Sequence, residues 1–101
     1  MNEYDARQIQ RMRERLKTFR AGGIELGVLV RDLEALMELL QTPTADWKAR
    51  FREHWFDMEQ VHAVALDRPD EAVVQENWAT IEAAVGAMLG LLDEQLGSSG
   101  G

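Results

Sequence analysis

Apolar residues recur three or four positions apart in four successive stretches of the sequence. This spacing places them along one side of an α-helix. No stretch shows the alternating apolar and polar residues, or the bounded β-branched runs, that are typical of strands. Glycines and prolines interrupt the pattern at Gly22, Gly23, Pro43 and Pro69. The sequence therefore predicts an all-α fold, a single-domain antiparallel bundle of about four helices joined by short connections.

The helix boundaries follow from the residues at each interruption. Gly22 or Gly23 supplies the left-handed residue that ends the first helix, and Thr42 or Thr44 caps the third. The bundle is expected to occupy residues 1–96. Residues 97–101 contain only glycine and serine and are interpreted as a flexible tail or an artificial extension. The expected helices are 3–21, 24–41, 43–66, and a fourth that begins between 70 and 77 and ends at 96.

Each predicted helix has one inward-facing row of side chains. His54 lies on the row of the third helix, where a partly buried imidazole bonded to a neighbouring helix is expected. All three tryptophans are expected to be wholly or partly in the core. The rows are Ile9, Met12, Leu16 and Phe19; Leu26, Leu29, Leu33, Leu36, Met37 and Leu40; Trp47, Phe51, His54, Met58, Val61 and Ala65; and Trp78, Ile81, Val85, Met88, Leu92 and Leu96.

The distribution of charge along the sequence limits the classes of molecule that this protein is expected to bind. The chain has 18 acidic and 11 basic side chains, a net charge of −7. Residues 1–22 carry six basic and three acidic side chains, a local +3, so the other 79 residues carry −10. The basic side chains surround the first helix and the remainder repels phosphate, so direct nucleic-acid binding is not expected. With neither a leader pattern nor an apolar run of the roughly 18 residues that span a membrane, we expect a cytoplasmic protein.

No set of residues converges on catalysis. There is no cysteine, and the only serines lie in the terminal tail, so a nucleophile with a paired base is missing. Glu59 and His62 are spaced as in carboxylate-bridged di-metal bundles, but those sites need a second such motif, and none occurs. We therefore expect no metal, no cofactor and no enzymatic activity.

The third helix carries one aromatic side chain away from its apolar row. Phe56 lies about 150° from the middle of that row on a helical wheel. It is either a single exposed apolar residue, which is common, or an interface anchor among polar neighbours. Carboxylates surround it and continue into the turn that follows. The candidate partner-binding residues are Glu53, Phe56, Asp57, Asp67, Asp70 and Glu71.

Two further helix faces are not explained by the inward rows. Apolar residues also lie on the other side of the second helix, which indicates a central helix with neighbours on both sides. A strip of small residues on the fourth helix is either a plain helical surface or the seam of a homodimer. The first set is Val28, Ala35 and Leu39, and the strip is Ala79, Ala83, Gly86, Ala87 and Gly90.

The order LKTFRAGGIELGVLVRDLEALMELL, then WKARFREHWFDMEQVHAVALD, then an acidic turn and a last amphipathic helix, resembles immunity proteins of the colicin D type. The resemblance covers most of residues 12–96. It implies a bacterial inhibitor that covers the basic, RNA-binding cleft of a ribonuclease toxin with an acidic surface. The resemblance rests on Phe19, Gly23 and Ile24 at the first turn and on Phe51, Trp55, Glu59 and Ala63 along the third helix.

The predicted function is therefore that of an immunity protein, monomeric alone, whose partner is a basic protein toxin of the nuclease class. A fixed acidic surface would speed association with such a partner, and a desolvated aromatic side chain would slow dissociation. The alternative is a non-enzymatic helical adaptor or dimeric regulator that uses the small-residue strip.

Overall fold

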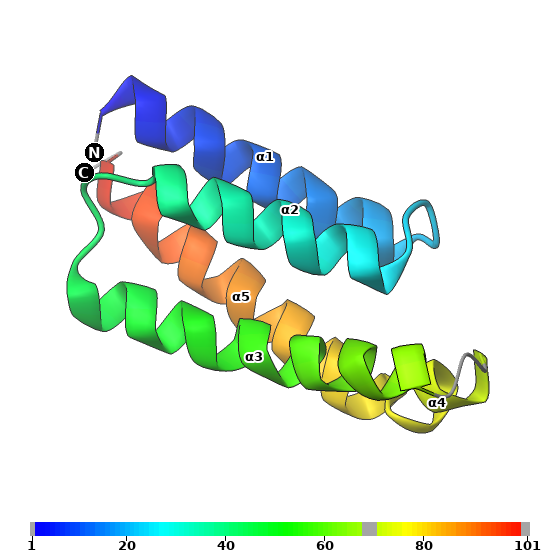
Figure 1. Cartoon of the computed structure of the whole chain (residues 1–101). Coiled ribbons are helices and arrows are strands. Elements are labelled where there is room, and N and C mark those ends of the chain that lie inside the picture. The colour runs from blue at the N-terminus through cyan, green and yellow to red at the C-terminus, as the bar shows by residue number, and fades with distance from the viewer. Residues whose placement is uncertain (1, 68–70, 100–101) are drawn as a thin grey trace.

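The structure, a computed structural model, describes residues 2–67 and 71–99, with the backbone alone at 71, 72, 98 and 99. Within these residues the chain forms five helices and no strand, which confirms the predicted all-α bundle (Figure 1). No helix in these ranges is both long enough and apolar enough to cross a membrane. The helices are α1 (Glu3–Arg20), α2 (Leu26–Leu39), α3 (Ala45–Asp67), α4 (Glu71–Glu76) and α5 (Trp78–Ser99).

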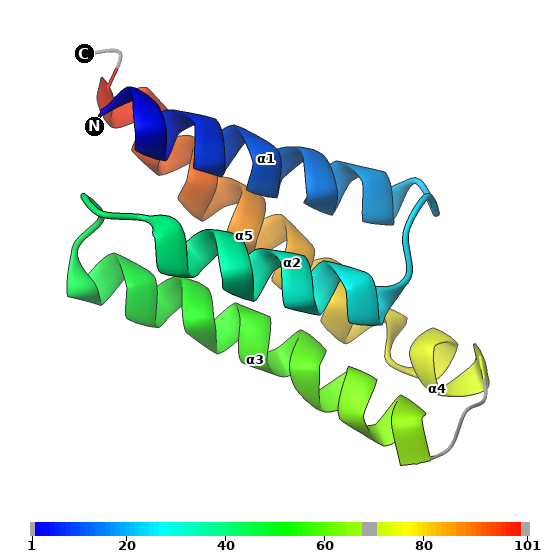
Figure 2. The ribbon, with the colours of Figure 1, turned by 45° about the horizontal axis from the view of Figure 1, so that its top comes forward.

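The four long helices form a four-sided bundle. Helix α2 packs between α1 and α3, and α5 packs between the same two helices on the other side. Successive long helices run in opposite directions, so both termini lie at one end and α4 lies at the other (Figures 1 and 2). The molecule measures 44 × 25 × 20 Å along its principal axes.

The predicted inward rows form the core. Ile9, Leu33, Phe51 and Ile81, one from each long helix, are completely buried. The side chains of Trp47 and Trp55 reach across the bundle: the Trp47 Nε1–H donates to the Leu91 carbonyl at 3.0 Å, and the Trp55 Nε1–H donates to the Val30 carbonyl at 2.8 Å. Residues of the hydrophobic core that the rows did not include are Val30, Val73, Ala84 and Leu91.

Trp78 and Leu39 are less enclosed than predicted. Trp78 is the first residue of α5, and its spacing places it on the inward row. It is nevertheless 40% exposed, because a groove opens beside its ring. Helix α2 has neighbours on two sides, as predicted, and Val28 is half-buried. Ala35 and Leu39 are nevertheless exposed, so these neighbours leave the outer side of α2 uncovered.

The turns use the predicted residues. Gly22 has a φ of 84°, the left-handed conformation that glycine adopts without strain. Its N–H donates to the Phe19 carbonyl and the Gly23 N–H donates to the Thr18 carbonyl, which is a Schellman ending. At the start of α3 the Thr44 hydroxyl accepts from the Trp47 N–H at 3.1 Å, so Thr44 and not Thr42 is the cap.

The predicted fourth helix corresponds to α5, which begins one residue after the predicted range of starts, and the short helix α4 before the break at Asn77 was not predicted. The Asn77 side-chain amide donates to the Val73 carbonyl at 2.8 Å, and its own carbonyl accepts from the Ile81 N–H at 3.0 Å. Asparagine side chains compete for backbone groups in this way, which ends one helix and starts the next. The predicted end at Leu96 is also early, because α5 continues to Ser99; residues 100 and 101 lie outside the described residues.

Asp5 is a buried carboxylate that links α1 to the connection between α2 and α3. It accepts hydrogen bonds from the N–H groups of Gln41 and Thr42 and from the Thr42 hydroxyl. Burial alone would raise its pKa, but these bonds, together with the Lys48 ammonium, outweigh that effect and hold the pKa of Asp5 below its ordinary value. Nothing in the local spacing of the sequence indicates this contact.

Candidate protein-binding face

Helix α3 contacts α2 and α5 along one side and leaves the other side to solvent at an edge of the bundle (Figure 1). At about 100° per residue, the exposed side chains on this solvent side run the length of α3 and include Asp46 and Ala49 near its start. We call the six from residue 53 onward the α3 outer face: Glu53, Phe56, Asp57, Gln60, Val64 and Asp67. They extend over about 21 Å of helix, at about 1.5 Å per residue.

Phe56 is exposed as its position on the wheel predicts. Half of it is accessible, at 50%, whereas Phe51 and Met58 on the other side of α3 are completely buried. Val64 lies two turns further along the same side and is 47% exposed. Val64 was not among the predicted partner-binding residues, although its spacing of eight residues from Phe56 places it on the same side of the helix. The outer face therefore holds two apolar side chains among polar ones.

The carboxylates beside Phe56 remain available for a partner. Glu53, Asp57 and Asp67 make no ion pair within the described residues, whereas four other carboxylates do. The cations of α1 are used in several of those pairs: Arg13, Arg15 and Arg20 contact Asp93, Asp32 and Glu82 at 3.0, 3.5 and 3.4 Å. These pairs occupy cations of α1, whereas the α3 outer face holds three carboxylates. Arg52, one turn before Phe56, is an exposed cation at the margin of this face.

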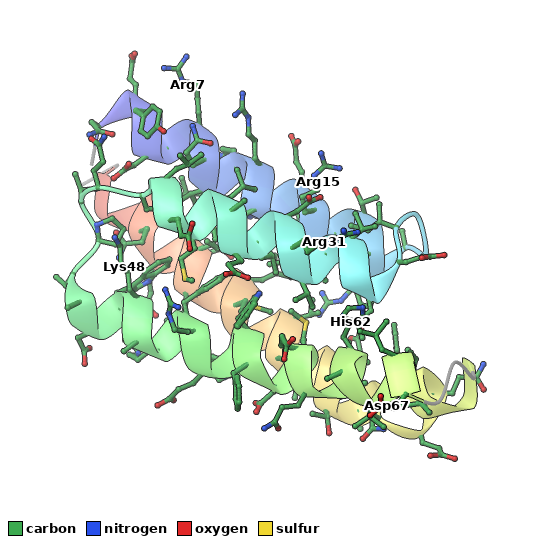
Figure 3. The ribbon with its side chains drawn as sticks, viewed as in Figure 1. Arg7, Arg15, Arg31, Lys48, His62 and Asp67 are labelled. Carbon is green, nitrogen blue, oxygen red and sulfur yellow. The ribbon has the colours of Figure 1, made fainter. Side chains whose placement is uncertain are left out.

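The predicted acidic turn has a different structure from the one expected. Asp67 is the last residue of α3 and belongs to the outer face (Figure 3). Glu71 is the first residue of α4, where only the backbone is described. Asp70 lies outside the described residues. The structure thus brings Glu53, Phe56, Asp57 and Asp67 onto one helix side, and it leaves the contribution of Asp70 and Glu71 a prediction.

Glu59 and His62 both lie on α3, and the His62 side chain packs against α2. The His62 imidazole lies against Gly27 of α2, so close that a Cβ atom on residue 27 would be 2.5 Å from the His62 Nε2 (Figure 3). Within residues 2–67 and 71–99 no three histidine or carboxylate side chains gather in the manner of metal ligands. His54 is half-buried, as predicted, but within the described residues it makes no hydrogen bond to a neighbouring helix.

The small-residue strip on α5 is open to solvent at Ala79, Ala83, Gly86 and Gly90. A Cβ on Gly90 would have no atom within 4 Å, so the strip is not closed by the chain's own described residues. The strip has no charged side chains and could contact a partner only through its flat surface of small residues. The α3 outer face combines negative charge with exposed apolar side chains, which suits a cationic protein surface. No protein-family model matches this chain, and no curated protein or solved structure matches it significantly.

Proposed function

We propose that this protein is an immunity-type inhibitor that binds a basic toxin of the nuclease class through the α3 outer face and covers its cleft. One observation carries the proposal: the half-exposed Phe56 lies beside Glu53 and Asp57, which make no ion pair within the described residues. Aromatic side chains within a polar rim are typical of binding hot spots.

The chemistry of a nuclease explains why such a face would suit it. A cleft that binds a nucleic acid must attract phosphates, and it therefore carries positive charge. Carboxylates held on a helix meet that charge and steer the two proteins together. An aromatic side chain buried at the centre of the contact then controls how slowly they separate. Inhibition of this kind needs no catalytic residue in the inhibitor.

The resemblance to colicin D immunity proteins supports the toxin class. Of the residues that carry it, Phe51 is buried and Trp55 bonds to α2, so they orient α3 within the bundle. Ala63 is exposed on the solvent side of α3, one turn from the outer-face residue Gln60. The residues that carry the resemblance thus support the role of α3 as the helix that presents the binding face. The negative charge of the α3 outer face supports a basic partner.

The decisive experiment is coexpression with the toxin whose gene adjoins that of this protein. Wild-type protein should protect the cells, and the double variant Glu53→Lys/Asp57→Lys should protect them less. The matched control Glu34→Lys/Glu38→Lys makes the same charge change at the same spacing on α2 and should protect fully. If cells that carry the toxin die equally with and without the wild-type protein, the immunity proposal is wrong.

The adaptor alternative is favoured only by the open strip on α5, and the mass in solution tests it. An inhibitor that is monomeric alone should have a mass of 11.5 kDa by light scattering. A dimer through the strip would have twice that mass and would revert to the monomer in the Gly90→Leu variant, since the space around Gly90 accepts a side chain within one molecule.

A further inference from the structure

At the end of the bundle that holds α4 (Figure 1), a groove of about 920 Å³ opens between the α1–α2 turn, the start of α2, the last part of α3 and the start of α5. We call it the end groove. Its volume lies in the range of small-molecule sites, roughly 300 to 1,000 Å³. Its walls are largely apolar and include Phe19, Ile24, Leu26, Ala65, Val74 and Trp78.

Trp78 presents aromatic surface to the end groove. One side of its ring packs on Phe19, with 5.9 Å between the ring centroids, and 40% of the residue is still exposed. The other two tryptophans use their indole N–H groups within the bundle, at Leu91 and Val30. Trp78 is therefore the tryptophan positioned to contact a ligand in the groove.

Two nitrogen-bearing side chains from different helices each lie against Gly27, at the edge of this apolar wall. The Arg31 Nε–H donates to the Gly27 carbonyl at 3.4 Å, so the arginine folds back along α2 toward the groove that it lines. The His62 imidazole approaches the same glycine from α3, and it also lines the groove. Arg31 makes no ion pair within the described residues, in contrast to the paired arginines Arg13, Arg15, Arg20 and Arg50.

We propose that the end groove binds a small amphipathic carboxylate, with its apolar body against Phe19 and Trp78 and its carboxylate on the Arg31 guanidinium near His62. An arginine head group matches a carboxylate in two parallel hydrogen bonds. Glu25 is the one carboxylate in the described lining, and it disfavours anions. The end groove lies on the bundle side of α3, away from the α3 outer face, so this proposal does not depend on the toxin.

The test titrates wild-type protein with decanoate and, as the matched cation, with decyltrimethylammonium. Decanoate should shift the amide signal of Gly27 and the indole signal of Trp78 in two-dimensional NMR spectra, while the buried Trp47 indole signal stays in place. The cation should bind at least about tenfold more weakly, because one charge-assisted hydrogen bond to a carboxylate accounts for that factor. Equal binding of the two probes, or no decanoate binding at millimolar concentration, would overturn the proposal.

Substitutions locate the carboxylate. Arg31→Gln should weaken decanoate binding at least about tenfold, and Arg7→Gln, at the other end of the bundle (Figure 3), should leave it unchanged. Glu25→Gln removes the opposing charge and should tighten binding. Both groove variants alter exposed side chains, so circular dichroism should match wild type. If Arg31→Gln and Arg7→Gln bind decanoate equally, Arg31 is not the carboxylate site.

Discussion

Phe56 is the residue on which the proposed interface depends most. Its side chain faces solvent on the side of α3 opposite the buried Phe51, so removing it costs the core nothing. Leu39 of α2 is exposed to a similar degree, at 44%, and the neighbouring Glu38 also makes no ion pair within the described residues. A comparison of Phe56 with Leu39 therefore tests whether the α3 outer face, and not any exposed apolar side chain near a carboxylate, binds the partner.

Phe56→Ala should leave the free energy of unfolding unchanged and weaken toxin binding by about 1 to 3 kcal/mol. The loss should appear mainly as faster dissociation, because an anchor acts after the encounter. Surface plasmon resonance gives both rate constants. Leu39→Ala is the control, and it should dissociate at the wild-type rate; equal rates for Phe56→Ala and wild type would remove Phe56 from the interface.

Asp5 is the residue whose role appears only in three dimensions. Replacing it by Asn keeps one acceptor oxygen, removes the negative charge and puts an NH2 group in place of the other oxygen, against the N–H of Gln41 or of Thr42. At neutral pH, Asp5→Asn should therefore destabilise the protein by about 1 to 3 kcal/mol.

The same residue predicts how stability depends on pH. Because the pKa of Asp5 is lowered in the folded protein, its contribution is present above the unfolded value of about 3.9 and is lost as pH falls through the folded value. Urea unfolding of wild type and Asp5→Asn from neutral to acid pH should show the two stabilities converging. A difference that is independent of pH would mean that the Asp5 carboxylate is not ionised in the native state.

At the scale of the helices, Gly27 of α2 lies directly against the His62 side chain of α3. Within an α-helix, alanine is more stabilising than glycine by roughly 0.5 to 1 kcal/mol, provided that its methyl group fits. Here a Cβ atom would be 2.5 Å from the His62 Nε2, so the steric cost opposes that gain. The glycine sets how closely the two helices pack.

Gly27→Ala should destabilise the protein by about 1 to 3 kcal/mol, in the range of overpacked cores. Adding His62→Ala removes the clashing ring, so the double variant should lose less stability than the sum of the single variants. Thermal and urea unfolding of all four proteins of this cycle measure the coupling. Additive losses would show that Gly27 and His62 do not touch.

At the scale of the whole molecule, net charge and the position of charge make different predictions. The chain carries −7 overall, which attracts any basic partner from a distance. On the α3 outer face, Glu53, Asp57 and Asp67 lie on the same side of the helix as the exposed apolar side chains of Phe56 and Val64. Removing equal negative charge from α3 and from α2 distinguishes the effect of net charge from the effect of where the charge lies.

Glu53→Lys/Asp57→Lys should slow association with the toxin about tenfold at low salt and flatten its dependence on ionic strength. Glu34→Lys/Glu38→Lys produces the same net charge on α2 and should slow association much less. Stopped-flow association at several salt concentrations makes the comparison. Equal slowing by the two variants would show that total charge, and not the α3 outer face, guides the encounter.

The sequence by itself determined the helices, their inward rows and the exposure of Phe56, because a residue's direction around its own helix depends only on local geometry. It missed the break at Asn77, where a side chain competes with the backbone, and so placed a single helix before Leu96. Only the tertiary structure decided the contacts of Asp5 with Gln41 and Thr42 and the approach of His62 to Gly27. These contacts join residues more than thirty positions apart, and their partners are chosen by how the helices pack, which local spacing does not encode.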